Sequence, residues 1–255
     1  MTRNFHIGIM GNLFSGKTTL MEALAKDPYK KDLEALLDNA EIHTFSERVD
    51  KGSLTDECLA LFYHDRVSNI FPTETAFLIM RTMQQREIRH LMTRENRHGV
   101  LVIEDRPFLD GPEVFVKRMI KSGEMPHAHA KLYRTIFCQT LHNEHIRLPD
   151  LTVYLRCEPG HLEKRRMQRA QNGDSYAATI TEQYLREIHE CYEDVAANWK
   201  KTLLKYQEHA IVPPDAELLT LPADIDMDEH PDFVHVIAGT IREKVRRMIA
   251  VRSNP

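Results

Sequence analysis

The sequence predicts a three-layer α/β/α fold built on a five-stranded parallel sheet, and three observations carry this prediction. Short apolar segments typical of strands alternate with longer segments of helical pattern along the chain. A continuously apolar run occurs at residues 100–103 (VLVI), as expected for a central parallel strand covered on both faces. A glycine-containing loop joins the first predicted strand to the first predicted helix. At 255 residues, the chain is expected to form a single domain over 1–255.

Five strands and eight helices are expected. The predicted strands cover residues 5–10, 42–45, 100–103, 151–155 and 217–221. The predicted helices cover residues 18–26, 54–63, 72–97, 112–122, 127–147, 159–169, 179–208 and 231–250. Pro72 suits the first turn of its helix, and the polar segment 172–175 (NGDS) marks a break between two helices. Parallel strands joined by helices place their ligands at the carboxyl edge of the sheet.

Composition excludes several classes of function. A net charge of −4 argues against broad nucleic-acid binding, which requires a basic surface. The chain has no apolar stretch long enough to span a membrane, and its first residues lack the pattern of a signal peptide. The cysteines have no C-x-x-C spacing and are Cys58, Cys138, Cys157 and Cys191. We therefore expect a cytoplasmic protein with no nucleic-acid or membrane partner.

The loop at residues 11–19 (GNLFSGKTT) matches the phosphate-binding pattern G-x-x-x-x-G-K-[ST]. The backbone N–H groups of such a loop and the positive end of the following helix surround a β-phosphate. Gly11 and Gly16 permit the sharp turn, Lys17 is expected to reach the β- and γ-phosphates, and the Thr18 hydroxyl is expected to ligate Mg²⁺. The predicted nucleotide-binding residues of the loop are Gly11, Asn12, Ser15, Gly16, Lys17, Thr18 and Thr19.

Charged residues also follow the second and third predicted strands, so they converge on this loop. Asp105 is expected to hold Mg²⁺ through water, and Arg106 can clamp phosphate oxygens with its fork of donors. Glu47 lies near the expected γ-phosphate and can accept the proton of an attacking hydroxyl. Taken alone, Glu47 could equally be a solvated loop carboxylate.

A predicted lid at about residues 165–178 carries two arginines. Arg165 and Arg169 are four residues apart and share a helix face, whereas Arg166 points elsewhere. Followed by a flexible loop, these two guanidinium groups can neutralise charge on a transferring phosphoryl group. The alternative is an ordinary solvated basic helix face.

Together these residues resemble the deoxynucleoside kinases, which phosphorylate the 5′-hydroxyl of deoxyribonucleosides with a nucleoside triphosphate. The resemblance covers most of the chain. The D-R pair at 105–106, the R-x-x-x-R lid and the Y-L-R-x-x-P stretch at 154–159 are more specific than the phosphate-binding loop alone. Further matching segments are Ser46-Glu47-Arg48, Phe62-Tyr63, Val114-Phe115 and Gln183-Tyr184-Leu185.

The resemblance implies catalytic roles for Glu47, Arg106, Lys17, Arg165 and Arg169. Glu47 would be the general base, with Arg106 beside the 5′-hydroxyl and the phosphates. The two lid arginines match lid arginines of the family. Asp105 and Thr18 would position Mg²⁺, and the donor would be ATP or another nucleoside triphosphate.

The resemblance also implies contacts to both nucleosides. Tyr63 matches a tyrosine at the sugar 3′-hydroxyl, Arg81 matches an arginine near the base, and Asp174 is the candidate for a lid carboxylate that contacts the sugar. The loop at about 223–229, with Asp226, would hold the donor base. A role in nucleotide salvage and a homodimer formed through the helices at 112–122 and 127–147 are further expectations.

The chain departs from the family pattern at several positions. Glu74 stands where a glutamine usually reads the nucleobase edge. Gly111 occupies the place of an expected aspartate, so Asp110, one position earlier, is the candidate substrate-binding carboxylate. Pro107 and Gln171 replace a usual serine and a third lid arginine. These changes bear first on base specificity and second on catalytic competence.

Glu74 suggests a preference for a guanine-like base. An ionised carboxylate only accepts hydrogen bonds, and guanine presents two adjacent donors to it. Adenine and cytosine place a ring acceptor beside their amino group, which repels the second oxygen. If Glu74 is protonated, it mimics glutamine and the preference vanishes. The alternative is that Glu74 turns away from the base to pair with Arg81.

Two other functions fit the motifs. A nucleoside monophosphate kinase of the thymidylate type also has the phosphate-binding loop, the D-R pair and an arginine lid. Glu47 at a base-like position weighs against it, because a monophosphate acceptor is already anionic. A non-catalytic, nucleotide-binding subunit is the second alternative, and the joint retention of Lys17, Glu47 and Arg106 weighs against that.

Overall fold

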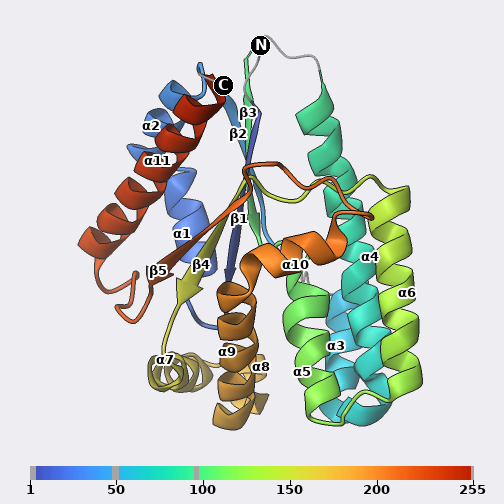
Figure 1. Cartoon of the computed structure of the whole chain (residues 1–255). Helices are drawn as coiled ribbons and strands as arrows, with labels where there is room; N and C mark the ends of the chain where they lie inside the picture. The colour runs from blue at the N-terminus through green and yellow to red at the C-terminus, as the bar shows by residue number, and fades with distance from the viewer. Residues whose placement is uncertain (1–3, 48–51, 95–97, 254–255) are drawn as a thin grey trace.

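In the computed structural model the chain folds around a central five-stranded sheet (Figure 1). The structure describes residues 4–47, 52–94 and 98–253. Arg48 of the Glu47 segment and Arg97, the expected end of one helix, lie outside the described residues. The strands are β1 (Phe5–Gly11), β2 (Glu41–Phe45), β3 (Val100–Asp105), β4 (Leu151–Arg156) and β5 (Glu217–Pro222).

All strand pairs are parallel, and the strand order is β2-β3-β1-β4-β5. At the centre of the sheet, Ile7 of β1 lies opposite Ile103 of β3 on one side and Leu151 of β4 on the other. Every residue of β1 and β3 is buried, as the apolar run at 100–103 predicts. The predicted five-stranded parallel sheet is therefore confirmed.

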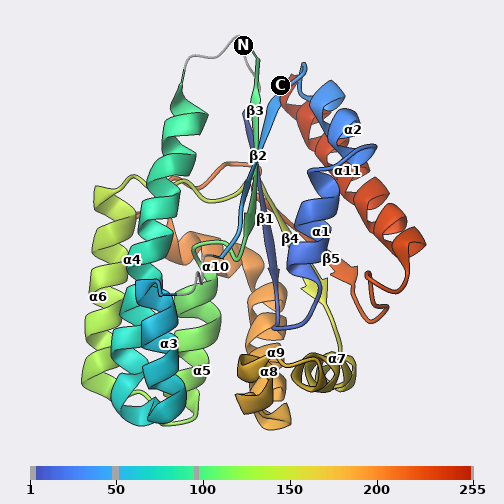
Figure 2. The same ribbon diagram turned by 180° about the vertical axis from the view of Figure 1, so that it is seen from behind.

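Helices cover both faces of the sheet, as Figures 1 and 2 show from opposite sides. One face is covered by α1 (Lys17–Leu24), α2 (Tyr29–Leu36) and α11 (Pro231–Ser253). The other face is covered by α4 (Arg66–Thr93), α6 (His127–Asn143), α9 (Glu182–Ala197) and α10 (Trp199–Tyr206). A separate apolar core fills the space on each side, with Leu20 and Ile241 in one and Phe108 and Tyr192 in the other.

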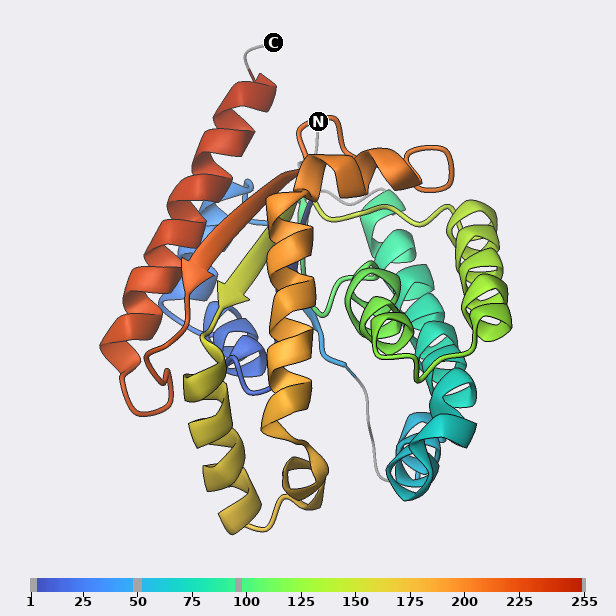
Figure 3. The ribbon, with the colours of Figure 1, turned by 60° about the horizontal axis from the view of Figure 1, so that its bottom comes forward.

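Three helices lie beyond the carboxyl ends of the strands and frame the site. They are α3 (Leu54–His64), α7 (Pro159–Gln171) and α8 (Ser175–Thr179), seen from this end in Figure 3. Helix α7 begins with Pro159 in its first turn and ends at the predicted polar break, so the chain turns back there into α8. The start of β1 and the end of α11 lie at the opposite end of the sheet (Figure 1).

The helix predicted over 72–97 starts earlier in the structure. Helix α4 begins at Arg66, where the Asp65 carboxylate accepts a hydrogen bond from the Ser68 N–H at 3.3 Å. Pro72 therefore lies inside the helix and not in its first turn, so that prediction was wrong. The Asp65 side chain caps the first turn and marks the start of the helix.

The segment predicted as one helix over 179–208 contains two helices, and a short helix, α8, ends at its first residue. Helix α8 ends at Thr179, α9 begins after the Thr181 side chain accepts a hydrogen bond from the Tyr184 N–H, and Asn198 separates α9 from α10. The segment predicted as one helix over 112–122 starts with a wider, π-helical turn, η1 (Gly111–Phe115), and continues as α5 (Val116–Lys121). Helix α2 was not predicted.

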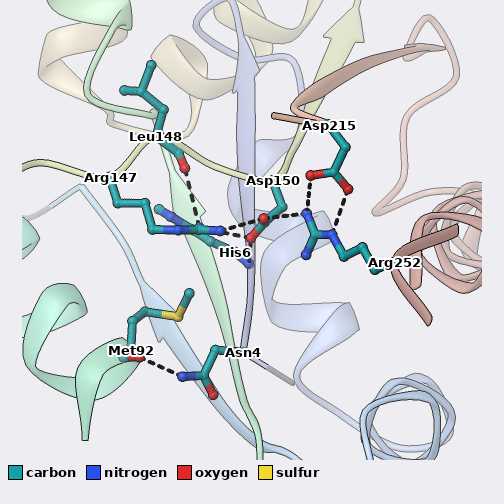
Figure 4. A network of polar contacts seen from close by, with 8 residues as sticks. All are labelled: Asn4, His6, Met92, Arg147, Leu148, Asp150, Asp215 and Arg252. Atoms are coloured by element: carbon teal, nitrogen blue, oxygen red, sulfur yellow. Dashed lines mark hydrogen bonds and ion pairs between the residues drawn. The ribbon is translucent and has the colours of Figure 1, made fainter. Parts of the chain in front are cut away.

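The amino edge of the sheet is fastened by a buried carboxylate (Figure 4). Asp150, just before β4, accepts hydrogen bonds from the His6 N–H at 2.8 Å and from the Arg147 and Arg252 guanidinium groups, each at 2.6 Å. Arg252 also pairs with Asp215. Burial would raise the pKa of Asp150, but the two arginines outweigh it and lower that pKa. This network joins β1, β4 and α11 far from the carboxyl edge.

Candidate active site

The phosphate-binding loop connects β1 to α1 at the carboxyl edge of the sheet. Gly16 adopts a left-handed backbone (φ +88°) immediately before the helix, which a residue with a side chain rarely does. The Lys17 ammonium is buried and reaches back across the loop to donate a hydrogen bond to the Asn12 carbonyl oxygen at 2.8 Å. The Asn12 side chain donates to the Leu185 carbonyl of α9, which anchors the loop. Burial, and after it the nearby charge of Arg106, lower the pKa of Lys17 to about 8.

The residues expected to hold Mg²⁺ lie together. The Thr18 hydroxyl donates to Asp105 Oδ2 at 3.0 Å, while Asp105 Oδ1 is buried and has no hydrogen-bond partner among the described residues. An unsatisfied carboxylate oxygen beside a hydroxyl suits a hard cation that keeps most of its ligands as water and phosphate. The donor set therefore fits Mg²⁺.

Glu47 is held between two guanidinium groups. Arg81 Nη2 lies 2.7 Å from Glu47 Oε1, and Arg106 Nε lies 2.8 Å from Glu47 Oε2. Arg106 has a left-handed backbone (φ +61°), and its N–H donates to the Ile9 carbonyl at the end of β1. Burial would raise the pKa of Glu47, but the charges of Arg106 and Arg81 outweigh it and lower that pKa. Glu47 is thus an anion, not a freely solvated carboxylate.

A cavity of about 310 Å³ opens beside Glu47 and Arg106. Its walls are mainly aromatic and apolar, with a few polar groups that converge on it, as is usual for a small-molecule site. Of the residues expected to bind the acceptor, four line it: Tyr63, Glu74, Arg81 and Asp174. Side chains from α3, α4, α5, α8 and α9 contribute to the same wall, so most of the cavity comes from the helices and not from the sheet.

Glu74 lies in the wall of this cavity and is 6% exposed. Burial raises the pKa of its carboxyl to about 7, against the opposing charge of Arg81. Within the described part of the chain, no ion pair joins Glu74 to Arg81, because Arg81 pairs with Glu47 instead. The alternative in which Glu74 is neutralised by direct pairing with Arg81 is therefore not what the structure contains.

Asp110 and Asp174 have different surroundings. Asp110 does not line the cavity; it is buried and accepts a hydrogen bond from the Tyr192 hydroxyl at 2.7 Å. Burial raises the pKa of Asp110 to about 7. Asp174 lines the cavity and also caps α8, because its Oδ1 accepts a hydrogen bond from the Ala177 N–H.

A second cavity of about 260 Å³ lies on the other side of the phosphate-binding loop. Arg165 and Arg169 of α7 both line it, together with Thr19 and Asp226, so the two arginines share a face as predicted. Arg165 donates to the carbonyl oxygens of Phe14 and Ala223 at 3.1 and 2.8 Å and lies 3.3 Å from Asp226 Oδ2. Helix α7 is thus fastened to both the phosphate-binding loop and the loop after β5. Arg166 points away and pairs with Glu163.

Several residues of the acceptor cavity had no role in the sequence analysis. Tyr176 of α8 packs against Tyr63, with ring centroids 5.4 Å apart, and its hydroxyl donates to Asp56 at 2.5 Å. Phe14, Phe115 and Tyr184 complete the aromatic wall. Phe14 lies in the phosphate-binding loop, and Phe115 and Tyr184 lie in segments that match the family, but their place in this cavity depends on how the helices pack over the sheet edge.

A parallel sheet with a phosphate-binding loop that faces a cavity containing a carboxylate is the arrangement of a P-loop kinase. The model of the family "Deoxynucleoside kinase" matches residues 7–230, and the chain therefore belongs to the deoxynucleoside kinase family. Members of this family are phosphotransferases that act on a nucleoside hydroxyl and use a nucleotide as phosphate donor.

A comparison with solved structures agrees on the fold. A deoxyadenosine kinase from M. mycoides, solved with dCMP and a flexible dCDP bound, has a TM-score of 0.64 to this chain at 20% sequence identity. The match covers 93% of this chain and 99% of that one. No curated protein matches the sequence significantly. Among the described residues, no helix is long and apolar enough to cross a membrane.

Proposed function

We propose that this protein transfers the γ-phosphoryl group of ATP, or another nucleoside triphosphate, to the 5′-hydroxyl of a deoxyribonucleoside, with Glu47 as the general base. The observation that carries this proposal is that Glu47 lines the 310 Å³ cavity together with Leu13 and Phe14 of the phosphate-binding loop. An acceptor in that cavity has its hydroxyl between the Glu47 carboxylate and the phosphates of the donor.

The transfer needs one proton acceptor and several cations. The 5′-oxygen attacks the γ-phosphorus, the bond from that phosphorus to the β–γ bridging oxygen breaks, and Glu47 takes the hydroxyl proton. The products are a deoxynucleoside monophosphate and a nucleoside diphosphate. Lys17 and Arg106 stabilise the charge on the phosphoryl oxygens, and Arg165 and Arg169 approach them from α7.

Mg²⁺ is held by Thr18 and Asp105, which is supported by the buried Asp105 oxygen without a hydrogen-bond partner. When bound, the ion neutralises negative charge on the donor phosphates. The loop at about 223–229 holds the donor base, which is supported by the place of Asp226 in the second cavity.

The acceptor is oriented by Tyr63, Glu74 and Asp174, all of which line the cavity. Glu74 favours a guanine base when it is ionised and accepts adenine or cytosine, as glutamine does, when it is protonated. A pKa of about 7 means that both forms are present at neutral pH. Turnover of the four deoxynucleosides by the parent and by Glu74→Gln tests this. Equal activity on all four that the substitution leaves unchanged would contradict the assignment of Glu74.

Homodimer formation in the cytoplasm completes the proposal. On the two helices expected to form the interface, Ile120 of α5 and Leu132 of α6 are exposed apolar side chains. The described cysteines are all unpaired, which suits a reducing compartment. Light scattering should give twice the 29.7 kDa of one chain, and Leu132→Glu should reduce the mass to that of one chain. A parent that is monomeric at micromolar concentration would contradict the dimer.

The experiment that tests the function is a transfer assay with a panel of acceptors. With ATP and Mg²⁺, we expect deoxynucleosides to be phosphorylated and nucleoside monophosphates to be poor acceptors. Glu47→Gln should lower kcat on the order of a hundredfold or more. Glu57→Gln, the same change at an exposed position on α3, is the matched control and should leave kcat unchanged. A Glu47→Gln enzyme with near-parental kcat, or faster transfer to monophosphates, would contradict the proposal.

A further inference from the structure

A glycine behind the wall of the acceptor cavity leaves room for the Arg81 side chain. Gly111 begins the π-helical turn η1 and lies directly against the tip of Arg81. A Cβ atom at Gly111 would lie 2.9 Å from Arg81 Nη1 and 3.0 Å from the Tyr133 hydroxyl. The first distance is too short for a carbon atom and the second is tight, so a side chain at Gly111 would make the flexible end of Arg81 shift.

The guanidinium group uses this space to reach Glu47. Its Nη2 contacts Glu47 Oε1 at 2.7 Å, on the opposite side of the carboxylate from Arg106. The side chain is 9% exposed and crosses above the Phe77 ring. Its buried Nε has no hydrogen-bond partner among the described residues. Arg81 thus contacts Glu47 while its own Nε–H lacks a partner. A buried donor without a partner is unfavourable for stability, which indicates a specific role for the contact between Arg81 and Glu47.

On the basis of the proposed function, we propose that Arg81 is a positioning residue for the general base, and that Gly111 is the residue that permits it. Each oxygen of the Glu47 carboxylate is held by a different arginine, so the side chain cannot rotate away from the acceptor hydroxyl. A proton acceptor must lie within hydrogen-bond distance of its proton, and this clamp sets that distance.

The charge of Arg81 also acts on the Glu74 end of the cavity, where it opposes the rise in pKa that burial causes at Glu74. Arg81 and Glu74 are seven residues apart on α4, two helical turns, and both line the cavity. The base-binding end and the general base are thus linked through one side chain. An acceptor that contacts Arg81 at its base contacts the group that orients Glu47.

Removal of the Arg81 charge should change the pH at which the base works. The charged groups that face Glu47 are Arg106 after β3, Arg81 and Glu74 on α4, and Lys17 on α1. Without Arg81, the balance between burial and positive charge shifts toward burial, so the pKa of Glu47 rises. The acid limb of kcat/KM, which reports groups of the free enzyme, then moves to higher pH.

The test compares these pH profiles in the full-length protein. Every variant is made in a Glu74→Gln background, so that Glu74 does not titrate in the same range. Arg81→Met should lower kcat on the order of tenfold to a hundredfold and move the acid limb to higher pH. Arg81→Lys keeps the positive charge, so its acid limb should lie close to the pH at which it lies with Arg81 present. Arg86→Met, an exposed arginine on the same helix, is the control and should leave kcat and the limb unchanged.

Substitution of Gly111 tests the same contact with Arg81 intact. In Gly111→Asp, the new carboxylate takes Arg81 away from Glu47, and the acid limb should move in the same direction as in Arg81→Met. Gly111→Ala, which displaces Arg81 without adding charge, should move it less. Gly239→Asp, at an exposed glycine of α11 with open space around it, is the matched control and should leave it unmoved.

The outcomes separate this inference from the function on which it rests. An active parent whose acid limb is unmoved in both Arg81→Met and Gly111→Asp overturns the role of Arg81 and leaves the kinase activity standing. A parent without transfer activity overturns the proposed function, and this inference with it. Thermal unfolding of Glu47→Gln, Arg81→Met and the double variant adds a readout independent of activity: coupled residues show non-additive changes in Tm, and additive changes contradict the contact.

Discussion

The phosphate-binding loop and the Glu74 end of the acceptor cavity both contain a buried ionisable group, but the two groups have different partners and surroundings. At the loop, Lys17 has a carbonyl partner and lies among the carboxylates of Asp105 and Glu47. At the other end, burial dominates at Glu74, and its neighbouring arginine is engaged elsewhere. The loop is thus prepared for one fixed charge, the phosphate, whereas the cavity end can exchange a proton and present two different hydrogen-bonding faces.

The largest effect is expected from removal of the Lys17 charge in the phosphate-binding loop. Lys17→Met should abolish nucleotide-dependent transfer, with a loss of about a thousandfold, because a buried donor to a developing anion is removed. A transfer assay at saturating ATP measures it. Lys26→Met, just after α1 and exposed, is the matched control. A Lys17→Met enzyme that keeps a tenth of the parental kcat would show that the phosphates bind elsewhere.

Glu74, at the opposite end of the site, should affect how the free energy of unfolding depends on pH. The pKa of Glu74 is raised from 4.5 to about 7 by burial, so folding takes up a proton between these values. The resulting cost is absent below about pH 4.5, grows with pH, and reaches roughly 3 kcal/mol above pH 7. Glu74→Gln removes the charge and should stabilise the protein more at pH 8 than at pH 5.

Denaturant titration at the two pH values measures the difference in free energy of unfolding. Glu57→Gln, at an exposed position, should show no such pH dependence and serves as the control. If Glu74→Gln changes the free energy of unfolding by the same amount at pH 5 and pH 8, Glu74 does not titrate between them. The contrast between the two ends of the site would then be lost.

A smaller effect is expected on acceptor choice. The ratio of kcat/KM for deoxyguanosine to that for deoxyadenosine should rise about tenfold between pH 6 and pH 8, as Glu74 loses its proton. A ratio cancels the pH dependence of steps shared by both acceptors. In Glu74→Gln the ratio should be flat over this range. A parental ratio that is also flat would remove Glu74 from base recognition.

The smallest effect is expected on nucleotide affinity. Lys17 has a pKa of about 8 in the free protein, and a bound phosphate favours its charged form. Binding therefore takes up a proton at high pH, and Kd for the nucleotide should rise by up to about tenfold from pH 7.5 to pH 9. Calorimetry in buffers of different ionisation enthalpy detects the proton directly. A Kd that is constant over this range would contradict a lowered pKa at Lys17.

The phosphate-binding loop could be predicted from the sequence more fully than the acceptor cavity. The phosphate-binding loop is nine consecutive residues with a strand before it and a helix after it, so local pattern was enough to find Lys17 and Thr18. The five parallel strands followed from apolar runs. The sheet order then brings Glu47 and Arg106 to the same edge, and both line the same cavity.

The remainder depends on packing that no short pattern encodes. Asp110 was expected at the acceptor, but it faces Tyr192, which lies 82 residues further along the chain. The pair between Arg81 and Glu47 needs the open space at Gly111, and a glycine in the sequence does not reveal which side chain will use it. Tyr176 lines the cavity because the short helix α8, which was not predicted, packs against α3.

The most direct test of the central claim is a structure of the protein with a deoxynucleoside and a non-hydrolysable ATP analogue bound. We predict the nucleoside in the 310 Å³ cavity, its 5′-oxygen within about 3 Å of a Glu47 oxygen and its base edge facing Glu74. A nucleoside bound in the opposite direction, with its base beside Glu47 and its 5′-oxygen away from the phosphates, would contradict the account.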